Sequence, residues 1–128
     1  MSDEHPEVTG EKFRMWLRPD GVVELAWAPH VPSGLEDALE AIDAMTRLTG
    51  GRPTPLLVRT TDAGPQDRAA RMEFIRRHEV VSAVALLVGN PLSRMMATFF
   101  INVSRPKAPT RMFEDEAEAL AWLKEHVA

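Results

Sequence analysis

Polar and turn-forming residues follow two strand-like runs of the sequence. The set comprises Thr60, Thr61, Asp62 and Gly64 after the run at 55–60, and Asn90, Ser93 and Arg94 after the run at 83–89. In an open parallel sheet the strand exits meet at one edge, where helix N-termini present unpaired N–H groups and partial positive charge. Arg94 adds a guanidinium that can donate two parallel hydrogen bonds. We therefore expect these residues to line one shallow rim that binds a phosphate or a partner's carboxylate.

The same rim residues also fit a purely structural role. Asp62, Gly64 and Asn90 are of types that commonly cap helices and close turns. The spacing alone leaves both interpretations open.

A second candidate surface is the segment 90–106, which is apolar on nearly all sides of a predicted helix. Three interpretations stay open: plain core packing, a contact between two copies of the chain in a closed homodimer, and the wall of an apolar ligand pocket. The residues that would form the dimer contact or the pocket are Met95, Met96, Phe99, Phe100 and Ile101.

The remaining charged residues indicate neither a metal site nor catalysis. The cluster Arg68, Arg71, Arg76, Arg77 and His78 is interrupted by acids and is expected to form a solvated helix face. The four histidines stand at no metal-ligand spacing. Sequence motifs for a nucleophile elbow, a phosphate loop or a dinucleotide fold do not occur. We expect no enzyme activity, no catalytic residue and no cofactor.

The elements that position these residues begin with a hairpin at 13–18 and 22–27. A helix follows, with Ser33 and Glu36 at the spacing of a capping box and Gly50 at its end. The strand at 55–60 precedes a helix that opens near Pro65, with Ala69, Met72 and Ile75 on its inner face.

In the second half, a fully apolar strand at 83–89 leads to a helix that is capped by Asn90 and ends near Ser104. A short strand at 109–113 precedes a closing helix that Asp115 begins. The resulting order is ββαβαβαβα, an α/β fold with a mixed, mostly parallel five-stranded sheet, an N-terminal hairpin and four helices. Residues 1–11 are predicted to form a flexible tail, and residues 12–128 a single domain.

Composition limits the partners that we expect. The 128 residues are 45% apolar and carry a net charge of −4, with no basic stripe that would favour nucleic acid or anionic lipid. The longest apolar run, at 80–88, is too short to span a bilayer, and the N-terminus lacks an apolar signal core. We expect a cytoplasmic protein that binds neither nucleic acid nor membranes.

The element order and the polar break at 60–64 resemble the STAS domain of anti-sigma-factor antagonists and sulfate transporters. The ending PTRMFEDEAEALAWL is similar to that of small bacterial STAS-like proteins, which are related by fold to CRAL-TRIO lipid-binding domains. In the antagonists this break carries an Asp-Ser-Ser-Gly motif whose serine is phosphorylated, whereas here the acid follows the hydroxyls and the serine pair is absent.

The STAS likeness implies a non-catalytic bacterial regulatory domain that recognises a protein partner or a second copy of itself. It also implies control by phosphorylation at Thr60 or Thr61. The CRAL-TRIO likeness implies the alternative, a domain that binds a lipid-like or other apolar small molecule.

Overall fold

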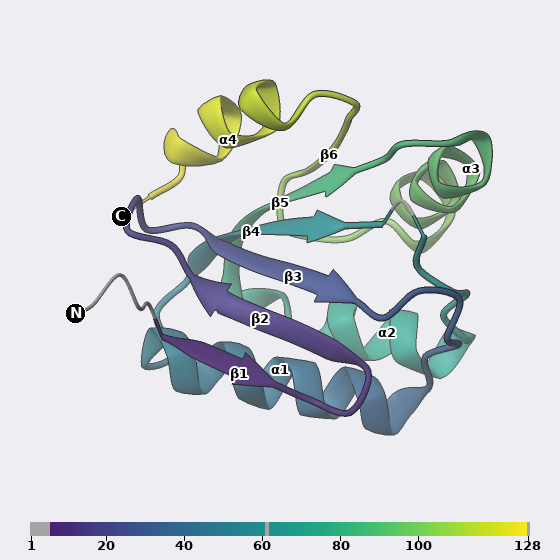
Figure 1. Cartoon of the computed structure of the whole chain (residues 1–128), viewed down its shortest axis with the longest axis horizontal. Coiled ribbons are helices and arrows are strands. Elements are labelled where there is room, and N and C mark those ends of the chain that lie inside the picture. Colours follow the sequence, from purple (N-terminus) through teal and green to yellow (C-terminus); the bar gives the residue numbers. More distant parts are fainter. Residues whose placement is uncertain (1–5, 61, 128) are drawn as a thin grey trace.

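The computed structural model describes residues 6–60 and 62–127, which form one mixed sheet flanked by helices (Figure 1). The strands of the described chain are β1 (Glu7–Thr9), β2 (Phe13–Leu17), β3 (Val23–Trp27), β4 (Thr54–Arg59), β5 (Val81–Leu87) and β6 (Thr110–Phe113). The α-helices are α1 (Leu35–Thr49), α2 (Arg68–Arg76), α3 (Pro91–Phe99) and α4 (Glu116–Lys124). A 3₁₀ turn, η1 (His78–Val80), follows α2, and a π-helical segment, η2 (Phe100–Ser104), extends α3.

The six described strands lie side by side in chain order, from β1 to β6. The first three are antiparallel, and β3 to β6 run parallel to one another. Each βαβ crossover therefore connects two neighbouring strands. Because crossovers of the same handedness place their helices on the same face of a sheet, these helices share one face. The α/β class, the hairpin and the four α-helices are confirmed.

The prediction of five strands is wrong, because β1 lies within the segment predicted as a tail. Val8 of β1 packs half-buried against the core, and Glu7 pairs with Arg14 of β2 at 3.2 Å. The edge of β2 also offers backbone groups that a further strand can pair. Three residues of β1 thus gain contacts that their composition did not indicate.

Two cores lie on the two faces of the sheet. The larger core joins β2 to β5 with α1 and α3, and includes Met15, Leu25, Met45 and Ala97. The smaller core packs α4 on the opposite face, through Leu123 against Leu57 and the alanines of β5. Figure 1 shows α4 and α1 on different sides of the sheet. The three crossover helices, α1, α2 and α3, therefore cover the face that carries the larger core.

Helix boundaries follow local capping, with two differences from the prediction. The N-cap of α1 is Gly34 rather than Ser33, and the Gly34 N–H donates to Asp37 at 2.8 Å. Gly50 ends this helix with a φ of 69°, as predicted. Helix α2 begins at Arg68 rather than near Pro65, because the Asp67 side chain accepts from the Ala70 N–H at 2.8 Å.

The inner face of α2 is also rotated by one residue from the prediction. Ala70 is buried, whereas Ala69 and Met72 face outward and Met72 is 41% exposed. The predicted starts of the last two helices are confirmed. Asn90 caps α3, with Pro91 as its first residue, and Asp115 caps α4. In the described residues, no helix is long and apolar enough to cross a membrane.

Candidate functional site

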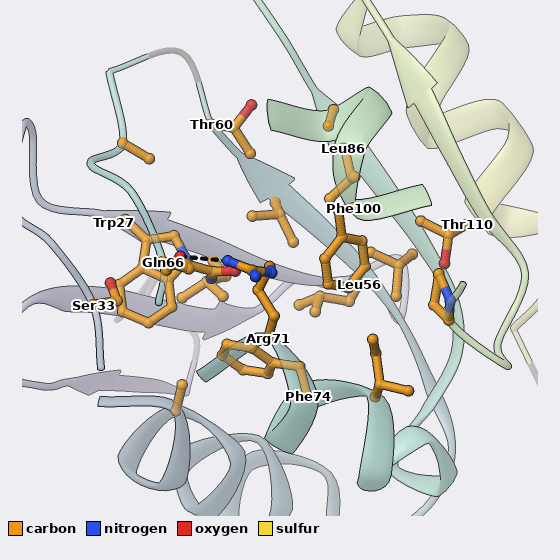
Figure 2. A pocket seen from close by; sticks show the side chains of 18 of the residues that line it. Trp27, Ser33, Leu56, Thr60, Gln66, Arg71, Phe74, Leu86, Phe100 and Thr110 are labelled. Carbon is orange, nitrogen blue, oxygen red and sulfur yellow. Dashed lines mark hydrogen bonds between the residues drawn. The ribbon is translucent and has the colours of Figure 1, made fainter. Parts of the chain in front are cut away.

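The main candidate site is a cavity of about 430 Å³ between the sheet and helices α1, α2 and α3. Its walls are mostly apolar, and they come from five strands, β2 to β6, from three α-helices and from both loops that precede α1 and α2. Figure 2 shows Leu56, Phe74, Leu86 and Phe100 around this space. Ligand pockets in proteins occupy about 300–1,000 Å³ and are predominantly apolar, so the size and lining suit a small organic molecule.

The floor of the cavity is formed by β4 and β5, two adjacent interior strands of the sheet. Leu56 of β4 and Val84 of β5 line it, and both are only half-buried although neighbouring strands flank them on each side. Side chains at such positions are normally covered by a crossover helix. Here the helices diverge above them, and the exposed surface of both residues faces the cavity.

One wall comes from α3 and its π-helical extension. Met95, Met96, Phe99 and Phe100, four of the five residues predicted for a dimer contact or an apolar pocket, line the cavity. The fifth, Ile101, packs partly buried against the larger core instead. Met95 is 63% exposed and Phe99 44% exposed, so these two side chains lie where the cavity meets the surface.

Arg71 of α2 places a guanidinium among these apolar walls. Figure 2 shows it between Trp27 and Gln66 on one side and Leu56 and Phe100 on the other. Its Nη1 donates to the Gln66 carbonyl oxygen at 2.8 Å, and its Cζ lies 5.1 Å from the centre of the Phe99 ring. The Nε atom is buried and has no hydrogen-bond partner.

The expected position of Arg71 on a solvated helix face is therefore wrong. The rotation of α2 turns Arg71 toward the sheet, on the same side as Phe74 and Ile75, which also line the cavity. A signal was present in the sequence, since Arg71, Phe74 and Ile75 stand three and four residues apart, as neighbours on one helix face do.

The described cavity lining contains basic side chains and no acidic ones. The basic side chains are Arg71, Arg77 and His78. Arg77 donates to Glu79 at 2.6 Å outside the lining, so that part of its charge is balanced. Among residues 6–60 and 62–127, no carboxylate pairs with the Arg71 guanidinium.

The predicted polar rim lies beside this cavity, and one residue of its first half, Thr60, is hydrogen-bonded internally. The Thr60 hydroxyl donates to the Leu87 carbonyl oxygen at 2.9 Å, which ties the exits of β4 and β5 together. Asp62 is exposed, and Thr61 lies outside the described residues. Gly64 is required by a close approach, because a Cβ there would lie 2.4 Å from the Val31 carbonyl oxygen.

The second half of the rim forms the cap of α3. The Ser93 side chain is fully buried, and its Oγ accepts from the N–H groups of Gly89 and Asn90 at 3.1 and 3.2 Å. Asn90 accepts from the Ser93 N–H at 2.8 Å, and Arg94 pairs with Glu114. Thr60 and Ser93 both border the cavity, so the two halves are close together. An anion-binding role for the rim stays a prediction.

An ion-pair network around the buried Glu24 lies on the opposite face of the sheet, and sequence reasoning missed it. Glu24 of β3 is 2% exposed and pairs with Arg18 and, at 2.9 Å, with Arg59, which also pairs with Glu116 at the start of α4. Burial lowers the pKa of Arg59, but the hydrogen bonds to Glu24 and Glu116 outweigh it and raise the pKa above its usual value. The network joins the turn after β2 with β3, β4 and α4, and we assign it a structural role.

Metal binding finds no support in the part of the chain that the structure describes. Nowhere in residues 6–60 and 62–127 do three His, Cys, Asp or Glu side chains gather at distances suited to a metal ion. The cavity also offers no metal-ligand set, because its lining has a single imidazole and no described carboxylate.

Residues 15–127 match the family described as Domain of unknown function (DUF7793). The chain belongs to this family. No curated protein matches the sequence.

Two solved structures are similar to the chain. The first is an uncharacterized protein of the DUF3478 family with a SpoIIAA-like fold from Shewanella loihica PV-4, with a TM-score of 0.62, 16% identity and coverage of 96% of this chain and 98% of that one. The second is a protein with unknown function from Arthrobacter sp. FB24, with a TM-score of 0.34, 32% identity and coverage of 85% and 96%. The first likeness confirms the STAS-like resemblance at the level of the fold.

Proposed function

We propose that this STAS-like domain is a non-catalytic binding domain whose ligand is an apolar small molecule held in the cavity. The observation that carries the proposal is the cavity floor, where Leu56 and Val84 of the interior strands β4 and β5 remain half-buried. A ligand over these side chains would complete the core on this face of the sheet. The flexible Met95 and Met96 side chains in the wall would adapt to its shape.

The energetic argument points the same way. The cavity opens to solvent beside the exposed Met95 and Phe99, so water is the alternative occupant. Water would gain few hydrogen bonds from these walls. An apolar occupant therefore accounts for the cavity best.

Native mass spectrometry of freshly purified protein tests this proposal directly. We expect a reproducible small adduct that is lost on denaturation. Binding of the neutral fluorescent probe N-phenyl-1-naphthylamine to delipidated protein provides the second measurement, because the probe gains fluorescence in apolar sites. Protein that shows no adduct and does not bind the probe would contradict the proposal.

A second candidate function, recognition of a protein partner or of a second copy of the chain, is favoured by a specific surface. Four large apolar side chains of α3 and η2 are exposed by 44% or more: Leu92, Met95, Phe99 and Val103. Leu92 does not line the cavity, so Leu92→Asp perturbs this stripe alone. We expect this substitution to lower the solution mass from dimer to monomer without unfolding the protein. A wild-type protein that is monomeric at all concentrations would contradict self-association.

A phosphorylation switch at Thr60 receives less support from the geometry. Its hydroxyl is half-buried and donates to Leu87, so a kinase would have to break the tie between β4 and β5 before it could act. Thr61 lies outside the described residues, and modification there stays a prediction. Phosphopeptide mapping of protein from growing cells checks both sites.

A further inference from the structure

We infer that the cavity ligand is an amphipathic monocarboxylate, with its apolar chain over the cavity floor and its carboxylate bound to Arg71. This inference rests on the proposed function and adds a head group to the apolar ligand. It arises from one juxtaposition, a guanidinium edge without a partner inside an apolar cavity that has no described carboxylate in its lining.

Two contacts, with Gln66 and with Phe99, hold the guanidinium of Arg71 in place. Nη1 donates to the Gln66 carbonyl oxygen, and the Phe99 ring stacks against the group. These contacts leave Nε and Nη2, which have no hydrogen bond among the described residues. In a guanidinium, the N–H groups of Nε and Nη2 point the same way and form an edge that binds a carboxylate through two parallel hydrogen bonds.

The buried Nε calls for an acceptor. A buried donor without a partner is costly, and such groups in folded proteins are usually satisfied by water or a ligand. The anchoring by Gln66 and Phe99 means that little further ordering is needed when the acceptor arrives. A carboxylate matches the two free donors and the single charge, whereas a phosphate monoester brings more negative charge and three acceptor oxygens.

The position of Arg71 also determines where the chain of a bound carboxylate would lie. Figure 2 shows the guanidinium next to Gln66, with Leu56, Leu86 and Phe100 on the other side of it. A chain attached to a carboxylate at Nε would extend over these apolar side chains. A neutral hydrocarbon could fill the same space, but it would leave the charged edge buried and unpaired.

The experiment compares dodecanoate with 1-dodecanol as competitors of N-phenyl-1-naphthylamine. The two compounds share one chain length and differ in the charged head group. We expect wild-type protein to bind dodecanoate about 10- to 100-fold more tightly, as hydrogen bonds to charged groups contribute. Arg71→Met should remove this preference, because it should weaken dodecanoate binding much more than dodecanol binding. Arg68→Met, at an exposed position of the same helix, is the matched control and should preserve it.

Each outcome decides a separate point. Equal affinity of wild-type protein for both compounds, or a preference that survives Arg71→Met, overturns the carboxylate assignment and leaves the proposed function standing. Tighter binding of dodecyl phosphate than of dodecanoate overturns it as well. If wild-type protein binds neither compound nor the probe, the proposed function itself fails. If Arg71→Met does not fold, the comparison of the two compounds on wild-type protein still decides the carboxylate assignment. Arg71→Lys, which keeps the charge but lacks the two parallel donors, should then reduce the preference for dodecanoate.

Discussion

Substitution of Val84 by phenylalanine tests whether the cavity is open space above the sheet. Val84 lies in the middle of β5, half-buried, with its side chain in the cavity lining. In a closely packed core, added atoms force strain that typically costs about 1–3 kcal/mol. Above Val84 there is instead a volume of about 430 Å³, so a phenyl ring can enter without displacing its neighbours.

The expected effect of Val84→Phe is a gain in stability. The ring adds about 60 Å² of apolar surface relative to valine, and its burial at about 25 cal/mol per Å² contributes about 1.5 kcal/mol. For a domain of this size, the corresponding rise in the melting temperature is about 5 °C. The same ring would occupy ligand space, so binding of N-phenyl-1-naphthylamine should weaken.

Val23→Phe is the matched control. Val23 belongs to β3, faces the same core as Val84 and is fully buried. There the added ring should lower the free energy of unfolding by about 1–3 kcal/mol. Urea unfolding followed by tryptophan fluorescence measures both variants. If Val84→Phe destabilises the protein as much as Val23→Phe does, the cavity is not available space and the reasoning is refuted.

Two further predictions concern charged groups outside the cavity. Glu24→Gln should lower the free energy of unfolding by about 2 kcal/mol in urea titrations, because it leaves Arg18 and Arg59 without their shared carboxylate. Both arginines are partly exposed, so the loss is smaller than for a fully buried ion pair. An unchanged urea midpoint would exclude the structural role of the network. The pKa of Asp37 is lowered by the Gly34 N–H and by Lys12. The stability advantage of wild type over Asp37→Asn should therefore be complete above the ordinary pKa of 3.8 and disappear as the pH falls below it, whereas a constant difference down to acid pH would contradict this assignment.

Periodicity and capping residues predicted most of the fold because they act locally. Asn90 and Asp115 accept hydrogen bonds from their own helices, so neighbouring positions of the sequence are enough to identify their capping role. Strand β1 could not be predicted in this way, since Val8 and Glu7 gain their contacts from β2 and the core. Its three residues carry too little apolar pattern to indicate a strand by themselves.

The candidate site was only partly predictable. The apolar character of segment 90–106 correctly indicated a surplus of apolar surface, and four of its residues line the cavity. Whether this apolar surface packs against the core, a ligand or a partner protein depends on the distance between α2 and α3. That distance is set by the tertiary structure. The sequence assigns Arg71 to solvent because acidic residues lie among the arginines of this helix, and because Ala69, Met72 and Ile75 are expected to form its inner face. An error of one residue in the buried face of a helix is enough to exchange a surface charge for a charge inside a cavity.

A crystal structure of the protein grown with dodecanoate would test the central claim most directly. We predict a single extended chain over Leu56 and Val84, with the carboxylate oxygens within hydrogen-bond distance of Nε and Nη2 of Arg71. A structure in which α2 and α3 close over the sheet, with Leu56 and Val84 covered by protein side chains and no room for a ligand, would contradict it.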